Sequence, residues 1–188
     1  MKFKNSALAT KLLSNLSGIE IGASAHNSFN LNTKNVDYSD DYTTIFKKEE
    51  VSMCGEYAKV DIVAHGDDLP LEDNSQDFVI SSHVIEHFWD PIKAVKEWMR
   101  VTKKGGYIYI ICPHKERTFD RDTPITFANE IIARHGLPKP STYDPYKHWS
   151  IWDTESFLDL CRKMNWDIHT HQDSDDKVGN GFAVVLNN

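Results

Sequence analysis

Short β-rich runs alternate with helical patterns along most of the chain, and this order of elements predicts the fold class. The strand-like runs occupy residues 18–22, 35–38, 60–64, 77–82, 107–112, 166–169 and 181–186. Residues 107–112 are continuously apolar, which is typical of a strand that is buried on both faces of a parallel sheet. Alternating strands and helices predict such a sheet with helices on both faces. We therefore expect an α/β fold whose ligand site lies at the carboxyl ends of its strands.

The spacing of apolar residues predicts the helices that cover this sheet. Four leucines within residues 8–16 fall on one side of a helix near the N-terminus. Asp90 and Pro91 open another helical pattern, because proline suits the first turn of a helix. Gly105 and Gly106 predict a turn before the central apolar strand. Further helices are predicted for residues 42–51, 126–135 and 154–164.

The length and the cysteines suggest one cytoplasmic domain. A chain of 188 residues can form one domain with a single core, here residues 1–188. No stretch approaches the roughly 18 apolar residues that span a bilayer, and the N-terminus lacks the apolar run of a signal peptide. Cys54, Cys112 and Cys161 are few and widely spaced, which favours free thiols in a reducing compartment. We expect no membrane association.

The charge of the chain argues against nucleic acid as a partner. Its formal net charge is -7, so a large basic surface is not expected. The sequence gives no indication of an oligomeric state.

Residues 69–108 carry the most specific pattern in the chain. In order and spacing, this segment resembles class I S-adenosylmethionine-dependent methyltransferases of the methyltransferase type 11 kind. The resemblance implies a Rossmann-like, seven-stranded, mostly parallel sheet with helices on both faces and an antiparallel last strand. It also implies S-adenosyl-L-methionine as the cofactor and O- or N-methylation of a small-molecule or glycan-type acceptor. The matching residues are Leu69, Pro70, Asp77, Phe78, Glu86, His87, Gly105 and Gly106.

The resemblance assigns cofactor-binding roles to residues after the first two strands. Glu20 and Gly22 match the acid and the first glycine of the family's glycine motif, and Ala23 is small enough to leave room beside them. The later glycines of that motif are replaced. Asp37 matches the acid that accepts hydrogen bonds from the ribose hydroxyls, a task that suits a charged acceptor. Tyr38 would pack near the adenine.

The spacing of the two acids departs from the family. Glu20 and Asp37 are 17 residues apart, fewer than the family usually has. The helix that normally lies between the first two strands must therefore be short or absent, and an asparagine-rich segment supports a loop there.

The third and fourth strands end in further cofactor candidates. Alignment backwards from residue 69 puts His65 where the family reads the adenine amino group, with Gly66 beside it. Asp67 is an alternative for the same role, and the sequence alone does not choose between the two. Ser82 ends the fourth strand beside the expected position of the methionine moiety.

Candidates for catalysis and acceptor binding follow the central strands. His83 and His114 each come directly after such a strand, and histidine titrates near neutral pH, so either can act as a general base. The residues expected to bind an anionic or hydroxyl-rich acceptor are Lys115, Arg117, Asp120, His148 and Trp149. The competing interpretation is a solvated loop held by an Arg117–Asp120 ion pair.

Two other functions compete with methyl transfer. Residues 83–87 spell H-x-x-E-H, the pattern of a group of zinc hydrolases, in which the two histidines share one helical face. Because the motif lies inside the longer methyltransferase pattern, we expect no metal ligands, and we expect His87 to be structural. The lost glycines favour the second alternative, a non-catalytic or partner-dependent binding module on the same fold.

Overall fold

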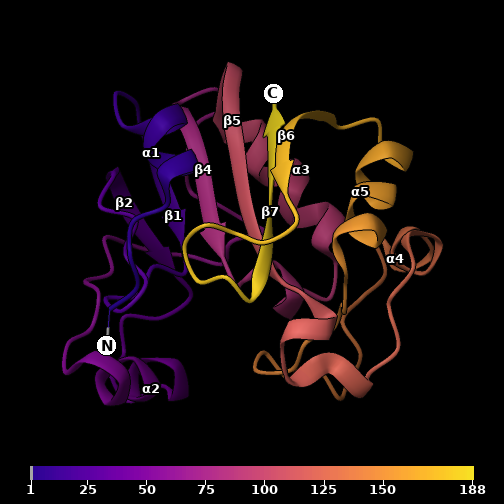
Figure 1. Cartoon of the computed structure of the whole chain (residues 1–188), viewed down its shortest axis with the longest axis horizontal. Helices are drawn as coiled ribbons and strands as arrows, with labels where there is room; N and C mark the ends of the chain where they lie inside the picture. The colour runs from indigo at the N-terminus through magenta and orange to yellow at the C-terminus, as the bar shows by residue number, and fades with distance from the viewer. Residues whose placement is uncertain (1) are drawn as a thin grey trace.

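The computed structural model describes residues 2–188 and has a seven-stranded sheet at its centre (Figure 1). The strands are β1 (Ser17–Ile21), β2 (Asn32–Asp37), β3 (Ile62–Val63), β4 (Gln76–Ser82), β5 (Thr102–Pro113), β6 (Asp167–Gln172) and β7 (Gly181–Asn187). Their order in the sheet is β3-β2-β1-β4-β5-β7-β6. The first five strands pair in parallel, whereas β7 runs antiparallel to both β5 and β6. The expected Rossmann-like topology with an antiparallel last strand is confirmed.

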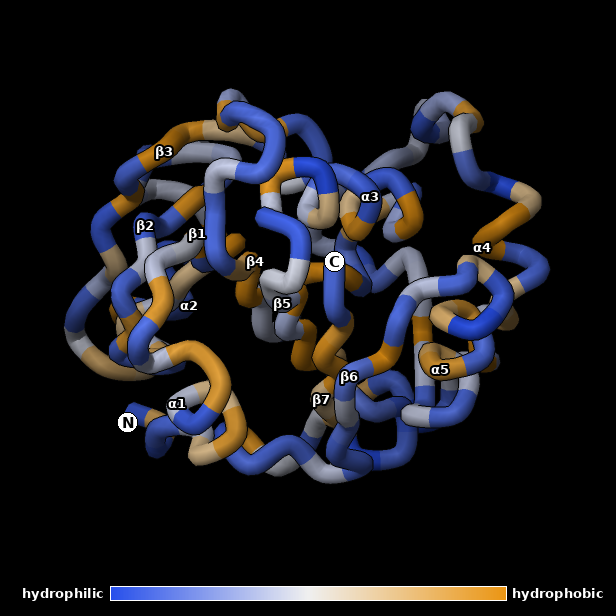
Figure 2. Tube along the Cα trace, turned by 90° about the horizontal axis from the view of Figure 1, so that it is seen from above, coloured by the Kyte–Doolittle hydropathy of each residue, from blue (hydrophilic) through white to orange (hydrophobic). Residues whose placement is uncertain are grey.

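Helices cover the two faces of the sheet unequally. One face packs against α3 (Pro91–Val101), α4 (Ala128–Arg134) and α5 (Thr154–Lys163), and the other against α1 (Ala7–Leu13) (Figure 2). Hydrophobic segments, orange in Figure 2, gather along β4, β5 and β7 between these layers. The helix α2 (Ile45–Cys54) lies apart, at the edge of the sheet where the parallel strands end.

The helix α3 illustrates why the predicted helices form. Asp90 caps its first turn by accepting a hydrogen bond from the backbone N–H of Lys93 at 3.0 Å, and Pro91 occupies the first turn. Ile92, Val95 and Trp98 recur at helical spacing and are all buried in the larger core. The helix is therefore amphipathic, with its apolar side against the sheet.

The structure corrects one predicted turn and shortens one predicted strand. Gly105 and Gly106 lie inside β5, where the pairing with β4 shifts between Gln76 and Phe78. Gly105 has φ 77°, so the extra residues form a bulge instead of a turn, and β5 begins at Thr102. The strand predicted at residues 60–64 is reduced to Ile62 and Val63.

The expectation that the helix between the first two strands is short or absent is confirmed. Within the described chain, residues 22–31 between β1 and β2 form turns and loops only. Phe29 from this loop packs against Tyr109 of β5, with ring centroids 6.1 Å apart. The loop and α1 together therefore cover this face of the sheet.

No helix among residues 2–188 is long and apolar enough to cross a membrane. The three cysteines, all in this part of the chain, carry free thiols.

Candidate active site at the carboxyl edge of the sheet

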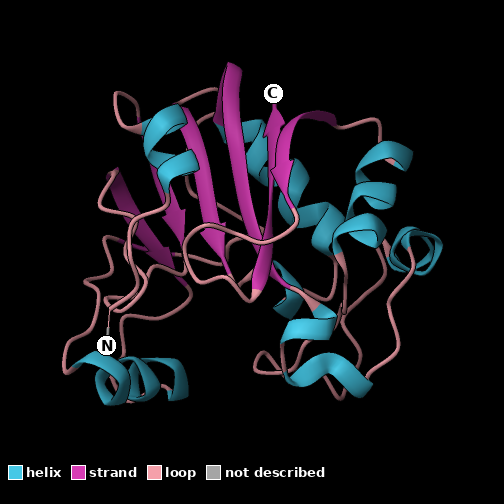
Figure 3. Cartoon of the chain, in the orientation of Figure 1, coloured by secondary structure: helices cyan, strands magenta, loops and turns pink. Residues whose placement is uncertain are grey.

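A cavity of about 960 Å³ lies at the carboxyl ends of the parallel strands. In Figure 1 the arrows of β1, β2 and β4 point to the lower edge of the sheet, with α2 on one side and two short 3-10 turns on the other. These turns are η2 (Lys115–Arg117) and η3 (Phe119–Asp122). Figure 3 shows that this edge consists mostly of loops and short helical turns. The expected location of the ligand site therefore coincides with the cavity.

Gly22 lines the cavity at the end of β1. Its φ is 68°, a left-handed conformation that strains other residues, and its N–H donates to the carbonyl of Val36 at 2.8 Å. A Cβ atom at this position would lie 2.8 Å from Cγ2 of Val84. The geometry therefore requires glycine here, and Ala23 beside it also lines the cavity.

Glu20 also lines the cavity but is only 6% exposed. Burial raises the pKa of its carboxyl to about 7, although the nearby Lys177 and a hydrogen bond with Thr33 oppose this rise. The Glu20 carboxyl therefore loses its proton near neutral pH in the folded protein, whereas in the unfolded chain it loses this proton at lower pH.

This raised pKa predicts a pH-dependent stability. Between the unfolded pKa of 4.5 and the folded value of about 7, the folded protein holds a proton that the unfolded chain has released. The free energy of unfolding should therefore fall as the pH rises through this window, by about 1–3 kcal/mol for this group. Urea unfolding of wild type and Glu20→Gln at pH 5, 6, 7 and 8 measures the effect.

The expected result is a stability difference between Glu20→Gln and wild type that grows in favour of the variant with rising pH. Glu72→Gln, at an exposed position, is the matched control and should show no such trend. A difference that stays constant over these pH values would contradict the raised pKa of Glu20.

Asp37, at the end of β2, belongs to a buried charge network with α2. The ammonium group of Lys47 lies 3.4 Å from Oδ2 of Asp37 and 3.2 Å from Oε2 of Glu50. Glu50 in turn accepts hydrogen bonds from the backbone N–H groups of Ala25 and Ala58. Burial raises the pKa of Asp37, and the Lys47 ammonium opposes this rise. The network ties α2 to the acid at the end of β2 and to the loop after β1.

The residues after β3 divide into two groups. His65 is exposed and lines the cavity together with Gly66. The carbonyl of Gly66 accepts a hydrogen bond from the indole Nε1 of the buried Trp98 at 2.7 Å. Asp67 is buried outside the cavity lining, and its carboxylate pairs with Lys93 at 3.2 Å.

Ser82 and His83 line the cavity at the end of β4. The hydroxyl of Ser82 accepts a hydrogen bond from Nδ2 of Asn27 at 3.0 Å. His83 has φ 55°, and its buried Nε2 has no hydrogen-bond partner among the described residues. Burial lowers the pKa of His83 to about 4, so its imidazole is neutral at physiological pH.

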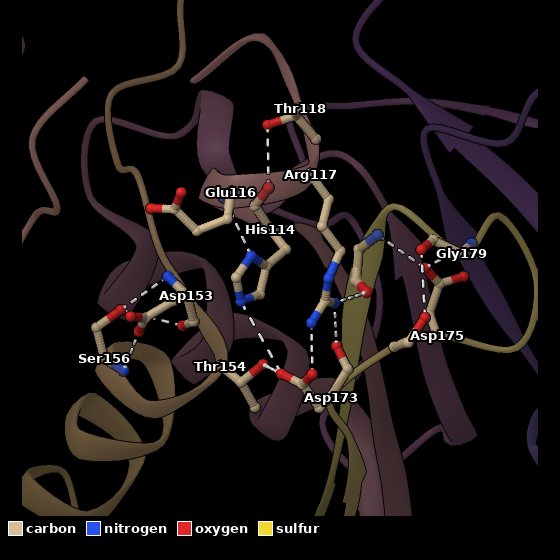
Figure 4. Close-up of polar contacts among 12 residues, drawn as sticks. His114, Glu116, Arg117, Thr118, Asp153, Thr154, Ser156, Asp173, Asp175 and Gly179 are labelled. Atoms are coloured by element: carbon tan, nitrogen blue, oxygen red, sulfur yellow. Dashed lines mark hydrogen bonds and ion pairs between the residues drawn. The ribbon is translucent and has the colours of Figure 1, made fainter. Parts of the chain in front are cut away.

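The second candidate base, His114, is not among the residues that line the cavity. Its Nδ1 accepts a hydrogen bond from the backbone N–H of Glu116 at 3.1 Å, and its Nε2 lies 3.9 Å from Asp173 (Figure 4). His114 thus contributes to the structure of the turn that follows β5.

Most of the predicted acceptor-binding residues have structural partners. Arg117 donates to the carboxylate of Asp173, as Figure 4 shows, and to the carbonyl of Gly181. The Arg117–Asp120 ion pair of the competing interpretation is therefore not formed. The reason is that η2 directs Arg117 toward the loop that precedes β7. Asp120 instead pairs with Nδ1 of His148 at 2.7 Å.

Lys115 and Trp149 are also held by neighbouring groups. The ammonium of Lys115 donates to the carbonyl of Arg121 and lies 3.2 Å from the Glu116 carboxylate. The indole of Trp149 donates to the carbonyl of Asp144 at 2.9 Å. Of the five predicted acceptor-binding residues, His148 alone is among those that line the cavity.

Glu86 and His87 line the cavity but had no predicted role in binding. They lie in a three-residue 3-10 turn, η1 (Ile85–His87), and not in an α-helix. The zinc-hydrolase alternative, which needs His83 and His87 on one helical face, is therefore wrong. Burial raises the pKa of Glu86 to about 8 and lowers the pKa of His87 to about 4.

Other lining residues were not predicted because their segments lack a recognisable pattern. They include Asn27, Lys47, Glu50, Phe119, Tyr143 and Tyr146. The long loop that contains Tyr143 and Tyr146 gave no periodic signal, and Lys47 and Glu50 look like solvated helix residues.

The fold and the cavity define a Rossmann-like protein of the methyltransferase class. A family model described as a methyltransferase domain matches residues 8–110, which is more than half of the chain. The chain belongs to this family.

Relatives support the same assignment over part of the chain. A probable S-adenosylmethionine-dependent methyltransferase of Mycolicibacterium smegmatis is 44% identical over 73 residues, which cover 37% of this chain and 28% of that protein. The matched region thus spans little more than a quarter of the relative's length.

Solved structures match nearly the whole fold. One is a SAM-dependent methyltransferase of Thermotoga maritima, described as a possible histamine N-methyltransferase, with a TM-score of 0.58 and 22% identity. That match covers 95% of this chain and 84% of the other. Another is a methyltransferase of Haloferax volcanii in complex with the Trm112 activator, with a TM-score of 0.58, 12% identity, and coverage of 94% and 84%. At sequence identities of 22% and 12%, both similarities show a shared fold.

Proposed function

We propose that this protein binds S-adenosyl-L-methionine in the carboxyl-edge cavity and transfers its methyl group to a small-molecule or glycan-type acceptor. The observation that carries the proposal is the meeting of Gly22 and Asp37 in one cavity. Gly22 brings the backbone at the end of β1 to the cavity in a left-handed conformation, with Val84 packed where a side chain would lie, and Asp37 offers a carboxylate at the end of the neighbouring strand. A volume of about 960 Å³ is at the upper end of common ligand sites, which leaves room for an acceptor.

The lining residues suit the parts of the cofactor. Asp37 would accept hydrogen bonds from the ribose hydroxyls, and Tyr38, which lines the same wall, would border the adenine. His65 is the better candidate for the adenine amino group, because Asp67 lies outside the lining and pairs with Lys93. Ser82 would lie beside the methionine moiety.

The cofactor, when bound, supplies an activated methyl group, and the protein contributes position and proton removal. The acceptor would be a hydroxyl or an amino group held at the end of β4. His83 is the better candidate base, because its neutral imidazole borders the cavity and its Nε2 has no hydrogen-bond partner among residues 2–188. His114 lies outside the lining and makes structural contacts. A well-placed base contributes about 10²–10⁴-fold to a rate.

A partner-dependent enzyme is the second candidate. It is motivated by the ion pair that Lys47 makes with Asp37, and by the Haloferax volcanii protein that was solved with an activator. A cytoplasmic location fits the free thiols of Cys54, Cys112 and Cys161.

Isothermal titration with S-adenosylmethionine and S-adenosylhomocysteine tests the proposal. We expect binding of one equivalent with a Kd in the micromolar range. Gly22→Ala should weaken it about tenfold or more, because the new Cβ would lie 2.8 Å from Val84, which also lines the cavity, and left-handed strain of roughly 1–2 kcal/mol would shift this backbone away from its position in the site.

The matched control is Gly55→Ala. Gly55 has φ 78°, a similar conformation, but a Cβ atom there meets no atom within 4 Å. This variant should bind the cofactor like wild type. No binding at millimolar ligand by the wild-type chain alone would contradict the simple enzyme and favour the partner-dependent alternative.

A further inference from the structure

Three groups that can bind a metal ion meet in one wall of the cavity. Glu86, His87 and His148 each present a ligand atom, and these atoms lie within 4.8 Å of one another. Glu86 and His87 come from η1, whereas His148 comes from a loop about sixty residues later. The backbone N–H of Trp149 donates to the carbonyl of Glu86 at 2.7 Å and so fixes that loop against η1.

Both histidines are oriented by a second hydrogen bond. Nδ1 of His148 lies 2.7 Å from Oδ2 of Asp120, and Nδ1 of His87 lies 3.3 Å from the carbonyl oxygen of Lys147. Because these oxygens only accept, both Nδ1 atoms must donate, and in a neutral ring each Nε2 then keeps a free lone pair. An imidazole held by an outer carboxylate or carbonyl is the usual arrangement of a metal-binding histidine.

The Nε2 atoms face the same carboxylate oxygen without bonding to it. Oε1 of Glu86 lies 3.8 Å from Nε2 of His87 and 4.0 Å from Nε2 of His148. These separations are too long for hydrogen bonds. The Glu86 side chain is only 1% exposed, so water cannot easily reach it. Its Oε2 atom nevertheless has no hydrogen-bond partner in the described part of the chain.

A metal ion between these groups would give the two Nε2 atoms and the Glu86 carboxylate a common partner. Bonds of 2.0–2.2 Å in a tetrahedral site hold neighbouring ligand atoms about 3.3–3.5 Å apart. The two separations from Oε1 would need to shorten by roughly half an ångström. The two histidine nitrogens, which lie within 4.8 Å of each other, would also need to approach through side-chain rotation. The ion would also give the buried carboxylate the partner that it lacks.

We propose that Glu86, His87 and His148 bind a divalent transition-metal ion, with Zn²⁺ as the first candidate. Two imidazoles and one carboxylate leave a coordination position open, as in catalytic zinc sites. Mg²⁺ does not fit this set, because it prefers oxygen ligands throughout. The set is also distinct from the H-x-x-E-H motif, because His83 is not part of the cluster and His148 takes its place.

The open position would face the cavity near the aromatic ring of Phe119, whose centroid lies 4.9 Å from that of His148. A ligand oxygen could bind there and be held close to the end of β4. That this oxygen belongs to the methyl acceptor rests on the proposed function, whereas metal binding itself does not.

The test uses the untagged, chelator-treated protein and two metal probes. Titration calorimetry with Zn²⁺ should give one equivalent bound, and Co²⁺ should give the visible absorption bands of a low-coordinate nitrogen and oxygen site. Zn²⁺ should displace Co²⁺ and remove these bands. His87→Ala and His148→Ala should each weaken Zn²⁺ binding at least 100-fold, and Asp120→Asn should weaken it about 10–100-fold.

His171→Ala, at an exposed position on β6, is the matched control and should bind both metals like wild type. No binding of Zn²⁺ by the wild-type protein at 100 μM ion would overturn the proposal, as would binding that is unchanged in His87→Ala and His148→Ala. Titration of the same samples with S-adenosylmethionine separates this result from the cofactor site. Cofactor binding without metal binding overturns the metal site alone, and metal binding without cofactor binding overturns the proposed function alone.

Discussion

Asp37→Ala is expected to weaken S-adenosylmethionine binding about 100-fold. The carboxylate is the charged acceptor at the end of β2 that would bind both ribose hydroxyls. Hydrogen bonds to charged groups contribute roughly 1.5–3 kcal/mol each, and a 100-fold change corresponds to about 2.7 kcal/mol. Titration calorimetry of the wild-type protein and the variant under the same buffer conditions measures the loss.

Asp40→Ala is the matched control for this prediction. Asp40 is an exposed acid three residues further along the chain and does not line the cavity. Its removal changes the net charge equally and should leave the affinity within about twofold of wild type. If both variants bind alike, Asp37 has no special role and the ribose lies elsewhere in the cavity.

Trp98→Ala should cost about 3–5 kcal/mol of the free energy of unfolding, the usual range for truncating a buried tryptophan. Trp98 is fully buried in α3, and its ring contacts that of Phe88 with centroids 6.2 Å apart. Because domains are stable by only about 5–15 kcal/mol, this is a large share of the total. Urea unfolding monitored by circular dichroism measures the change.

A second substitution separates packing from hydrogen bonding at this position. Trp98→Phe keeps most of the ring but leaves the carbonyl of Gly66 without its indole donor, which should cost about 1–3 kcal/mol. Because Gly66 lines the cavity, this variant should also weaken cofactor binding. Trp149→Ala, at a half-buried position, should cost less than Trp98→Ala. Equal costs for Trp98→Ala and Trp149→Ala would contradict the central place of Trp98 in the core.

The fold was predictable because its signals are local and repeated. Residues 107–112 form a continuous apolar run, and the helix after Asp90 has a cap and a helical period. Both signals can be recognised in the sequence without knowing which residues pack against these segments. The bulge at Gly105 was not predictable, because it depends on the register between β4 and β5. A glycine pair looks the same in a turn and in a bulge.

The residues predicted to bind the cofactor lie at strand ends, and the structure brings most of them together in the cavity. Glu20, Gly22, Asp37 and Ser82 all line the cavity, since each ends or follows a parallel strand. The part of the site expected to bind the acceptor could not be predicted from the sequence, because it is formed by loops that meet through long-range contacts. The pairing of Arg117 with Asp173 joins residues 56 positions apart, and no local pattern marks it.

The Lys47–Asp37 ion pair has a consequence for the entry and exit of the cofactor. An ammonium group already occupies the carboxylate that a ribose would use, so binding of the nucleoside is an exchange of partners. Glu50, 3.2 Å from the same ammonium, can keep Lys47 neutralised when Asp37 turns to the sugar. If the ribose binds Asp37 as proposed, Lys47 would compete with it for the carboxylate and would pair with Asp37 again when the ribose leaves. Such an exchange would keep the Asp37 carboxylate paired in the empty site and would weaken the retention of the product.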